Sequence, residues 1–180
     1  MTEEEKNNIK KHIQDIQAKA INHITSSFEK SINPICALDM GMGKTFIACN
    51  IIKETISTNP DYKVFIVAKA SNYITPWIRG LLDTNCISYK PDSNIFENCI
   101  HMHGKERFKY QNEKTGFYRF PASNIIISAY DTLRIDINSE RYDLSLNYDL
   151  LIFDELQIVM NSKKQTKSLM LISKLKAEKN

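Results

Sequence analysis

The sequence predicts an α/β fold in which a mostly parallel β-sheet carries helices on both faces. Four short apolar runs have the length and the residue types of buried strands, at residues 35–38, 63–68, 124–128 and 148–153. Segments with apolar residues at helical spacing lie between them, at residues 46–57, 72–83 and 130–136. This alternation is typical of parallel sheets, because a parallel connection has to cross the sheet and a helix usually makes that crossing.

The 180 residues have the length of a single domain. We therefore expect one domain over the whole chain, with a helical segment over residues 1–30 ahead of a core over residues 31–180. Thr2 and Glu5 form the Thr-x-x-Glu pattern of a capping box, which predicts a helix start. Apolar residues then recur at helical spacing, so we expect one or two amphipathic helices over residues 3–29.

The remaining segments give weaker signals. Turn-forming residues predict a loop over residues 84–96, and a polar, basic and aromatic composition predicts another over residues 104–121. Between these loops we expect a short strand at residues 99–102. A final helix is expected over residues 164–177.

The composition excludes several classes of protein. No apolar run approaches the roughly 18 residues that a membrane-spanning helix needs. The first residues, MTEEE, are acidic and polar, unlike a secretory signal peptide, so we expect an intracellular protein. The four cysteines form no C-x-x-C pair, which argues against a structural zinc site and predicts reduced thiols. A net charge of +3 permits contact with nucleic acid without arguing for it.

A loop of sequence GMGKT follows the first apolar run and precedes a helix. Gly41 and Gly43 allow the backbone N–H groups to curl around phosphate oxygens, and the start of the helix favours negative charge. In this pattern Lys44 would reach the β- and γ-phosphates of a triphosphate, and the hydroxyl of Thr45 would bind Mg²⁺. Leu38 stands where the full phosphate-loop pattern has its first glycine. A chance Gly-Lys-Thr turn is therefore the alternative.

Two acidic residues, Asp154 and Glu155, follow the last apolar run. Asp154 can hold Mg²⁺ through water, and Glu155 can orient and deprotonate an attacking water. Ligand sites of open α/β sheets lie at the carboxyl ends of strands, where Lys44 is expected as well. An Asp-Glu pair at a strand end is common without any function. Together with the glycine loop, however, it predicts an ATP- and magnesium-binding hydrolase with Lys44, Asp154 and Glu155 as its catalytic residues.

With these residues in view, the chain resembles the N-terminal RecA-like lobe of a superfamily-two helicase, of the Swi/Snf-type translocase branch. Five segments are similar to the glutamine motif and to motifs I, Ia, Ib and II, in that order, at residues 16–21, 39–45, 64–69, 125–134 and 148–157. Five matches in order make the resemblance specific. It implies a RecA-like P-loop NTPase lobe that uses ATP and Mg²⁺ and couples ATP binding and hydrolysis to nucleic-acid binding.

The resemblance also implies roles for individual residues. Gln17 belongs to the glutamine motif, which reads adenine. In this family the loops after motifs Ia and Ib meet the backbone of the nucleic acid, and double-stranded DNA is the implied partner. The implied contacts are Lys69, Ser71, Asn72, Tyr130, Thr132 and Arg134.

The chain departs from the family in three ways. Lys69 stands where the family usually has proline, and Gln157 replaces the histidine that couples the nucleotide state to motif III. Motif III and the second lobe are not found before Asn180. In RecA-like lobes the motif III strand lies between the strands of motifs I and II, so we expect this sheet to lack one central strand. We also expect a protein partner, or a second copy of the chain, to supply the missing lobe or strand.

The missing lobe bears on the expected activity. Positive charge delivered to the transition state of phosphoryl transfer is worth roughly a thousandfold or more in related NTPases. In this family the second lobe carries that charge. We therefore expect the chain alone to bind ATP and to hydrolyse it poorly.

Two other hypotheses remain. A helicase lobe can serve as a non-enzymatic module that binds nucleic acid or protein, and the intact Lys44, Asp154 and Glu155 favour an enzyme instead. A different P-loop enzyme, such as a small kinase, is disfavoured by the five ordered motifs.

The segment 104–119 has interleaved basic and aromatic side chains, which allow two interpretations. They can contact phosphates and stack on bases, or the segment can be a solvated loop whose aromatic side chains pack on the rest of the domain. Among other side chains, we expect Trp77 in the core and no metal site at His101 and His103.

Overall fold

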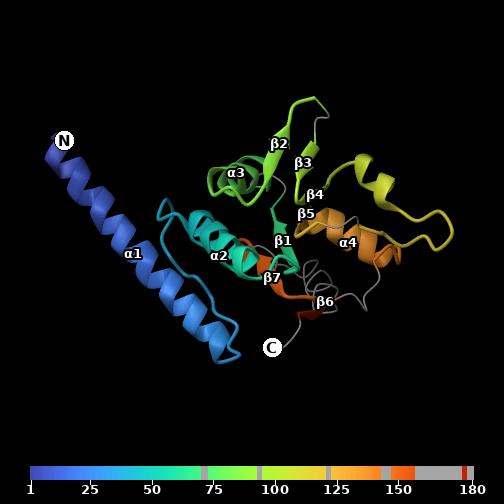
Figure 1. Cartoon of the computed structure of the whole chain (residues 1–180), viewed down its shortest axis with the longest axis horizontal. Coiled ribbons are helices and arrows are strands. Elements are labelled where there is room, and N and C mark those ends of the chain that lie inside the picture. Colours follow the sequence, from blue (N-terminus) through green and yellow to red (C-terminus); the bar gives the residue numbers. More distant parts are fainter. Residues whose placement is uncertain (70–72, 93–94, 121–122, 143–146, 157–175, 178–180) are drawn as a thin grey trace.

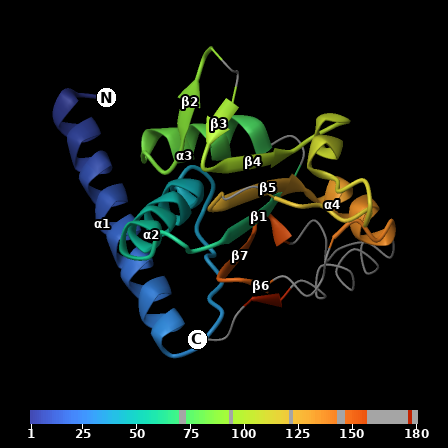
Figure 2. The ribbon, with the colours of Figure 1, turned by 45° about the vertical axis from the view of Figure 1, so that its right-hand side comes forward.

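The central sheet has four strands, and all neighbouring strands run parallel. The computed structural model describes residues 1–69, 73–92, 95–120, 123–142, 147–156 and 176–177. The strand order is β4-β5-β1-β7, with bounds Cys99–Met102, Ile125–Ala129, Val64–Ala68 and Leu150–Phe153. Each adjacent pair is parallel, and Figure 2 shows the strands side by side across the middle of the molecule. The predicted α/β fold with a mostly parallel sheet is confirmed.

Helices cover both faces of this sheet. One face packs against α2 (Lys44–Thr58), the π-helical turn η1 (Tyr73–Ile78) and α3 (Arg79–Asp83). The other face packs against α4 (Tyr130–Asn138). Side chains of β1 alternate between the two clusters, and every residue of β1 is buried. Burial on both faces explains why the strands appear in the sequence as continuous apolar runs rather than as an alternating pattern.

The N-terminal segment is one helix, α1, over Glu3–Glu29. It begins with the predicted capping box, because Thr2 Oγ1 accepts from the Glu5 N–H at 3.2 Å and Glu5 Oε2 accepts from the Thr2 N–H at 2.6 Å. Toward its C-terminal end, Ile24 packs against Ile47 and Ile51 of α2. The first twelve residues are exposed, and Figure 1 shows this end of α1 reaching beyond the rest of the molecule.

Two predictions for the middle of the chain need correction. Residues 84–96 are not a loop throughout, because β2 (Ser88–Lys90) and β3 (Ile95–Glu97) form an antiparallel hairpin. Cross-strand pairs stabilise it: the rings of Tyr89 and Phe96 lie 5.1 Å apart, and Lys90 pairs with Glu97. These pairs join residues that the sequence separates by a turn, so a local pattern does not reveal them.

The helix predicted over residues 72–83 is divided into η1 and α3. Pro76 lies inside η1. Proline has no backbone N–H and crowds the carbonyl four residues earlier, so a regular α-helix cannot pass through it. Residues 104–121, predicted as a loop, contain the short 3₁₀-helix η2 at Glu106–Tyr110 and an isolated bridge between Gln111 and Tyr118.

The strand predicted at residues 35–38 is not formed. Among the described residues no strand pairs with this segment, although its side chains alternate as in a strand: Cys36 and Leu38 pack against α1 and α2, while Ile35 is 87% exposed. The alternating burial fits a run of strand length, but a strand also needs a neighbour for its backbone. Among the described residues this segment and β7 are not paired, and the absence of one strand between them stays a prediction.

The end of the chain is described only in part. Residues 164–175 of the predicted final helix lie outside the described residues, as does Gln157. Lys176–Ala177 form β8, which pairs parallel with β6 at Asn147–Tyr148, so the predicted helix does not include these two residues. The reason is that the backbone groups of β8 bond to another strand. Within the described parts, no helix is both long enough and apolar enough to cross a membrane.

Candidate nucleotide and magnesium site

The loop before α2 takes a backbone conformation that requires glycine at two positions. Gly41 has φ 81° and Gly43 has φ 80°, both in the left-handed region. Gly43 is the N-cap of α2, and the Met42 N–H donates to the Asp39 carbonyl at 3.3 Å to close the turn. This geometry places the start of α2, with its exposed backbone N–H groups, directly behind the loop. Such an arrangement is a ready site for an anion.

Lys44 lies across this loop. Its Nζ donates to the carbonyl oxygen of Leu38 at 2.7 Å and to that of Asp39 at 3.2 Å. The lysine cation therefore caps the carbonyls of its own loop, and no acidic side chain of the described residues forms an ion pair with it. Both bonds are to neutral carbonyls, so the phosphate oxygens of a nucleotide would be stronger acceptors for the same ammonium group.

Gln17 of α1 closes the loop from the other side. Its Nε2 donates to the Met42 carbonyl at 3.2 Å. A Cβ atom added to Gly43 would lie only 2.5 Å from that Nε2. The resemblance placed Gln17 near the nucleotide, and in the structure its amide rests directly on the phosphate loop. A cavity of about 410 Å³ begins beside it, lined by Met1, Lys6, Ile9, Lys10, Ile13, Gln14, Gln17 and Phe46.

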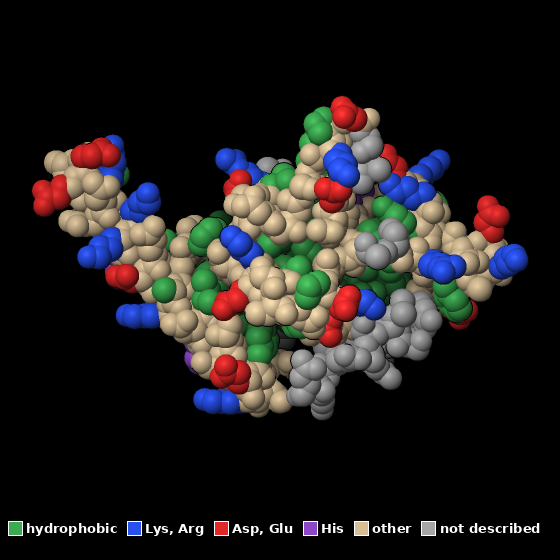
Figure 3. Space-filling model, in the orientation of Figure 1, with side chains coloured by type: hydrophobic (Ala, Val, Ile, Leu, Met, Phe, Trp, Pro, Cys, Tyr) green, Lys and Arg blue, Asp and Glu red, His purple; other side chains and the backbone are tan. Residues whose placement is uncertain are grey.

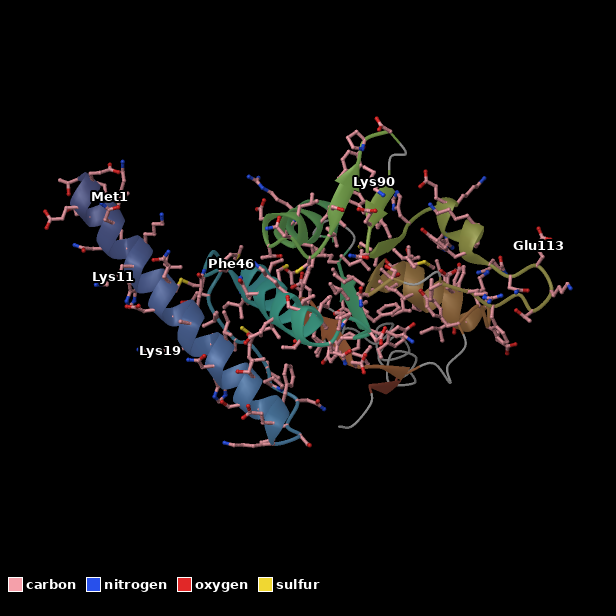
Figure 4. The ribbon with its side chains drawn as sticks, viewed as in Figure 1. Met1, Lys11, Lys19, Phe46, Lys90 and Glu113 are labelled. Atoms are coloured by element: carbon pink, nitrogen blue, oxygen red, sulfur yellow. The ribbon has the colours of Figure 1, made fainter. Side chains whose placement is uncertain are left out.

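This cavity lies between α1 and the start of α2. Figure 4 shows Phe46 where α2 faces α1, and Met1 and Lys11 on the part of α1 that extends away from the body. Phe46 is 47% exposed and Ile9 is 51% exposed. Apolar side chains therefore line a concave surface next to the phosphate loop, as a site for a flat organic group requires.

Asp154 follows directly after β7, at the carboxyl end of the sheet. Its backbone N–H donates to the Val67 carbonyl at 2.9 Å, which continues the pairing of β7 with β1. The indole Nε1 of Trp77 donates to Asp154 Oδ2 at 2.9 Å, and the Tyr130 hydroxyl donates to the Asp154 carbonyl at 2.8 Å. Asp154 is thus held by three elements besides its own strand.

Glu155 has φ 51°, in the left-handed region that side chains disfavour. The strain is of the order of 1 kcal/mol, and it occurs immediately after the strand, where the chain turns sharply. Strained backbone of this kind concentrates at functional sites, because it aims a side chain that a relaxed turn would place elsewhere. Asp154 and Glu155 are both partly buried.

The donor groups suit ATP with Mg²⁺. The loop with left-handed glycines leads directly into the start of α2, and the Lys44 cation lies on this loop. Thr45 and Asp154 carry side-chain oxygens, the type of ligand that magnesium prefers. The Gln17 amide lies so close to Gly43 that a side chain at that position would displace it. Among the described residues there is no cluster of three or more metal-binding side chains of the His, Cys, Asp and Glu types.

The side chains expected to meet nucleic acid are placed differently from one another. Lys69 is exposed at the end of β1, and Thr132 is half-buried on α4. Arg134 is also half-buried, with Nη2 3.4 Å from Asp131 Oδ1. Tyr130 is only 9% exposed, its ring packs in the cluster beneath α4, and burial beside Asp154 raises the pKa of its hydroxyl. Ser71 and Asn72 lie outside the described residues.

The basic and aromatic segment 104–119 is anchored to the body. Asp136 of α4 is fully buried and accepts from Arg107 Nε at 2.8 Å and from Arg141 Nη1 at 3.2 Å. The Phe108 ring lies 4.3 Å from the Arg107 guanidinium carbon and 5.1 Å from that of Arg141. Arg107 is thus committed to an internal ion pair, which agrees with the packing alternative for this residue.

Sequence reasoning missed one contact of Trp77, and no local signal could have revealed it. Trp77 is in the core as predicted, at 2% exposed, but its N–H reaches Asp154. Burial lowers the pKa of His101 to about 4, so this half-buried ring stays neutral, stacked 5.3 Å from His103. All four cysteines are free thiols, and burial raises the pKa of Cys99 to about 12.

Comparison with known proteins identifies the family. Residues 10–173 match the family model described as type III restriction enzyme, res subunit (ResIII). The chain belongs to this family. Together with the relatives below, the ResIII match confirms the predicted resemblance to the N-terminal RecA-like lobe of superfamily-two proteins of the Swi/Snf type.

Curated relatives of this ResIII-family chain include two chromatin-remodelling ATPases named INO80. The protein from Lodderomyces elongisporus is 22% identical over 164 residues, which are 89% of this chain and 10% of the relative. The protein from Schizosaccharomyces pombe is 21% identical over 154 residues, which are 83% of this chain and 9% of the relative. The chain therefore spans about a tenth of the length of these relatives.

A solved structure shares the fold. The SWI2/SNF2 ATPase core of Sulfolobus solfataricus, in complex with double-stranded DNA, superposes with a TM-score of 0.66 at 20% identity. The superposition covers 90% of this chain and 29% of that one. It confirms the RecA-like architecture of the ResIII-family chain.

Proposed function

We propose that this chain is the ATP-binding motor lobe of a Swi/Snf-like DNA translocase. The observation that carries the proposal is the loop of left-handed glycines at the start of α2, with Lys44 lying on it and Gln17 resting against it. Few other ligands than a nucleotide polyphosphate suit a helix start, a lysine and an apolar cavity that adjoin one another.

In this proposal each site residue has one task. The N–H groups around Gly41 and Gly43 bind phosphate oxygens, and Lys44 exchanges its two carbonyl partners for the β- and γ-phosphates. Thr45 and Asp154 hold Mg²⁺.

Glu155 orients the attacking water and accepts its proton, and Gln17 contacts the adenine next to the cavity. ATP and Mg²⁺ supply the phosphoanhydride bond and the neutralising charge for phosphoryl transfer.

We also propose double-stranded DNA as the partner, since the fold relative was solved bound to it. Lys69 lies at the end of β1, and Thr132 and Arg134 lie on α4, which follows β5. Both strands end at the carboxyl edge of the sheet, so these side chains and Asp154 belong to the same edge. Ser71, Asn72 and the largely buried Tyr130 complete the proposed set.

Turnover by these 180 residues alone is proposed to be slow. The relatives are about ten times longer, and we infer that the charge which stabilises the transition state comes from a second lobe. A longer chain, a partner protein or a second copy of this chain would supply it. The chain as a whole acts as a single lobe, with residues 1–30 as its helical arm and residues 31–180 as its core.

Isothermal titration of the chain with ATP and Mg²⁺ tests the proposal. Lys44→Ala should abolish detectable binding, because the variant loses the only side-chain cation that the phosphate loop carries at its helix start. Lys53→Ala is the matched control, since Lys53 is exposed on the same helix, and it should bind as the wild type does. Equal affinity in wild type and Lys44→Ala, with both folded by circular dichroism, would refute the proposal.

A further inference from the structure

Asp154 is fixed in place by residues from β1, η1 and α4. Its backbone N–H bonds to Val67, its carbonyl accepts from the Tyr130 hydroxyl, and one carboxylate oxygen accepts from Trp77. These contacts restrain both the peptide groups around Asp154 and its side chain. Nothing in the strand itself would hold the carboxylate, because side chains at strand ends are otherwise free to change rotamer.

Packing alone does not account for the Trp77 contact. The indole ring is 2% exposed and packs in the cluster that joins α2 to the sheet, with Cys49, Ile52 and Ile66. Phenylalanine would supply similar apolar contacts. The indole differs by its N–H, a buried donor that needs an acceptor, and the acceptor here is an acidic side chain. A hydrogen bond to a charged group is shorter and stronger than one between neutral groups.

We propose that Trp77 is a positioning residue for magnesium binding by Asp154, with Tyr130 supporting the same residue through its backbone. The indole holds Oδ2 and leaves Oδ1 for the metal. Within the described residues Oδ1 makes no hydrogen bond. This inference rests on the proposed function, in which Asp154 is a magnesium ligand, and adds that its carboxylate is ordered before the metal arrives.

The contact also connects separate parts of the site. Trp77 belongs to η1, which follows β1, and Tyr130 is the first residue of α4, which follows β5. The segments after these two strands are the ones proposed to meet DNA. Asp154 is therefore held by α4, which carries Thr132 and Arg134, and by η1, which begins shortly after Lys69. A shift of either element would move its carboxylate.

A spectroscopic experiment tests the contact without nucleotide. Trp77 is the only tryptophan of the chain, so its fluorescence reports this indole alone. Asp154→Asn replaces the charged acceptor and keeps the shape, and should shift the emission maximum and the hydrogen-bond-sensitive indole Raman band. Asp83→Asn is the control, because it removes an exposed charge on the neighbouring α3 and should leave both signals unchanged. Identical spectra for wild type and Asp154→Asn would overturn the inference.

A binding experiment tests the function of the contact. ATP affinity is measured by titration with and without Mg²⁺ in the wild type, Trp77→Phe and Tyr130→Phe. Without metal, we expect the ATP affinity of each variant to lie within about twofold of the wild type. The factor by which Mg²⁺ increases the affinity should fall about three- to tenfold, because that is the cost of ordering one side chain on binding. Combining Trp77→Phe with Asp154→Asn should give no further loss, because both act on the same carboxylate.

The outcomes separate this inference from the proposed function. An equal loss of affinity with and without Mg²⁺ would mean that Trp77 is merely structural, and an unchanged magnesium gain would mean that the contact has no role; either result overturns the inference. If the wild type binds no ATP, the proposed function fails, and the inferred role of Trp77 fails with it. If Lys44→Ala loses binding while Trp77→Phe keeps the full magnesium gain, only the inference fails. The spectroscopic experiment leaves Trp77 in place, so the inference can be tested even if Trp77→Phe does not fold.

Discussion

At the scale of single residues, two glycines in one loop have different reasons for being glycine. Gly41 and Gly43 have nearly the same left-handed φ, so a side chain would strain the backbone at either position. Only at Gly43 would the added carbon meet another group, the Gln17 amide at 2.5 Å; at Gly41 nothing lies within 4 Å. A comparison of substitutions at the two positions therefore distinguishes the effect of backbone strain from the effect of a steric clash.

We expect Gly43→Ala to cost more than Gly41→Ala. Each should lose about 1 kcal/mol of unfolding free energy from strain. Gly43→Ala should in addition displace Gln17 and lower ATP affinity further. Denaturant titrations and calorimetry would measure both quantities. Adding Gln17→Ala to Gly43→Ala should recover part of the loss, and failure to recover any of it would contradict the assigned clash.

The sequence alone revealed the residue types of the site but not their contacts. The sequence revealed GMGKT and Asp154-Glu155 because a glycine loop, a lysine and a strand-end acid are seldom combined except in a nucleotide site. Trp77 was placed correctly in the core, but its N–H donation to Asp154 joins residues far apart in the chain, and no local pattern encodes such a pair. The left-handed Glu155 is likewise a property of the tertiary turn.

At the scale of elements, a buried ion pair fastens η2 and the segment around it to α4. Asp136 is fully buried, and two arginines satisfy it, one from η2 and one from just beyond α4. A buried charge without partners is costly, so each arginine matters more than an exposed one would. This explains why a segment that is basic in composition does not place Arg107 at the surface for phosphate.

Arg107→Met should lower the free energy of unfolding by about 3 kcal/mol, because it keeps much of the side-chain volume but leaves Asp136 partly unpaired. Lys105→Met provides the control, since Lys105 is exposed at the start of the same 3₁₀-helix, and it should change stability by less than about 0.5 kcal/mol. Urea unfolding followed by circular dichroism measures both. Similar losses in the two variants would show that the ion pair is not important.

The sequence misjudged two segments whose structure depends on strand pairing. Residues 35–38 have strand-like alternation, yet a strand requires a neighbour, and none pairs with them in the described part of the chain. The β2–β3 hairpin was missed for the opposite reason, because its strands are only three residues long and depend on cross-strand pairs. Helices α2 and α4 and the long α1 were found, since helical hydrogen bonds are local.

At the scale of the whole molecule, charge bears on the proposed DNA contact. The net charge is only +3, and Figure 3 shows Lys and Arg side chains spread over this face and interspersed with acidic ones. The described residues on the face in this view form no large basic patch. The contribution of this lobe should therefore come from a few phosphate contacts near the carboxyl edge of the sheet.

We expect binding to duplex DNA to be weak, without sequence preference, and to weaken as salt rises, since phosphate contacts release counterions. Lys69→Ala should reduce both the affinity and the salt dependence, by about one counterion. Lys90→Ala is the control, because Lys90 is paired with Glu97 on the hairpin. Fluorescence anisotropy over a salt series measures these quantities. A tight, salt-resistant, sequence-dependent complex would contradict the prediction.

The sequence by itself determined the fold class and the family, and it predicted the chemistry of the site. These features depend on local patterns, namely hydrophobic periodicity, the glycine loop and the strand-end acids. Local patterns can be recognised from the sequence alone. Tertiary structure decided the rest. It left residues 35–38 without a strand partner, committed Arg107 to Asp136, and directed Trp77 and Tyr130 onto Asp154. The physical reason is that buried polar and charged groups bond to the groups that packing places next to them. These neighbours are often far apart in the sequence, so a local sequence pattern does not reveal them.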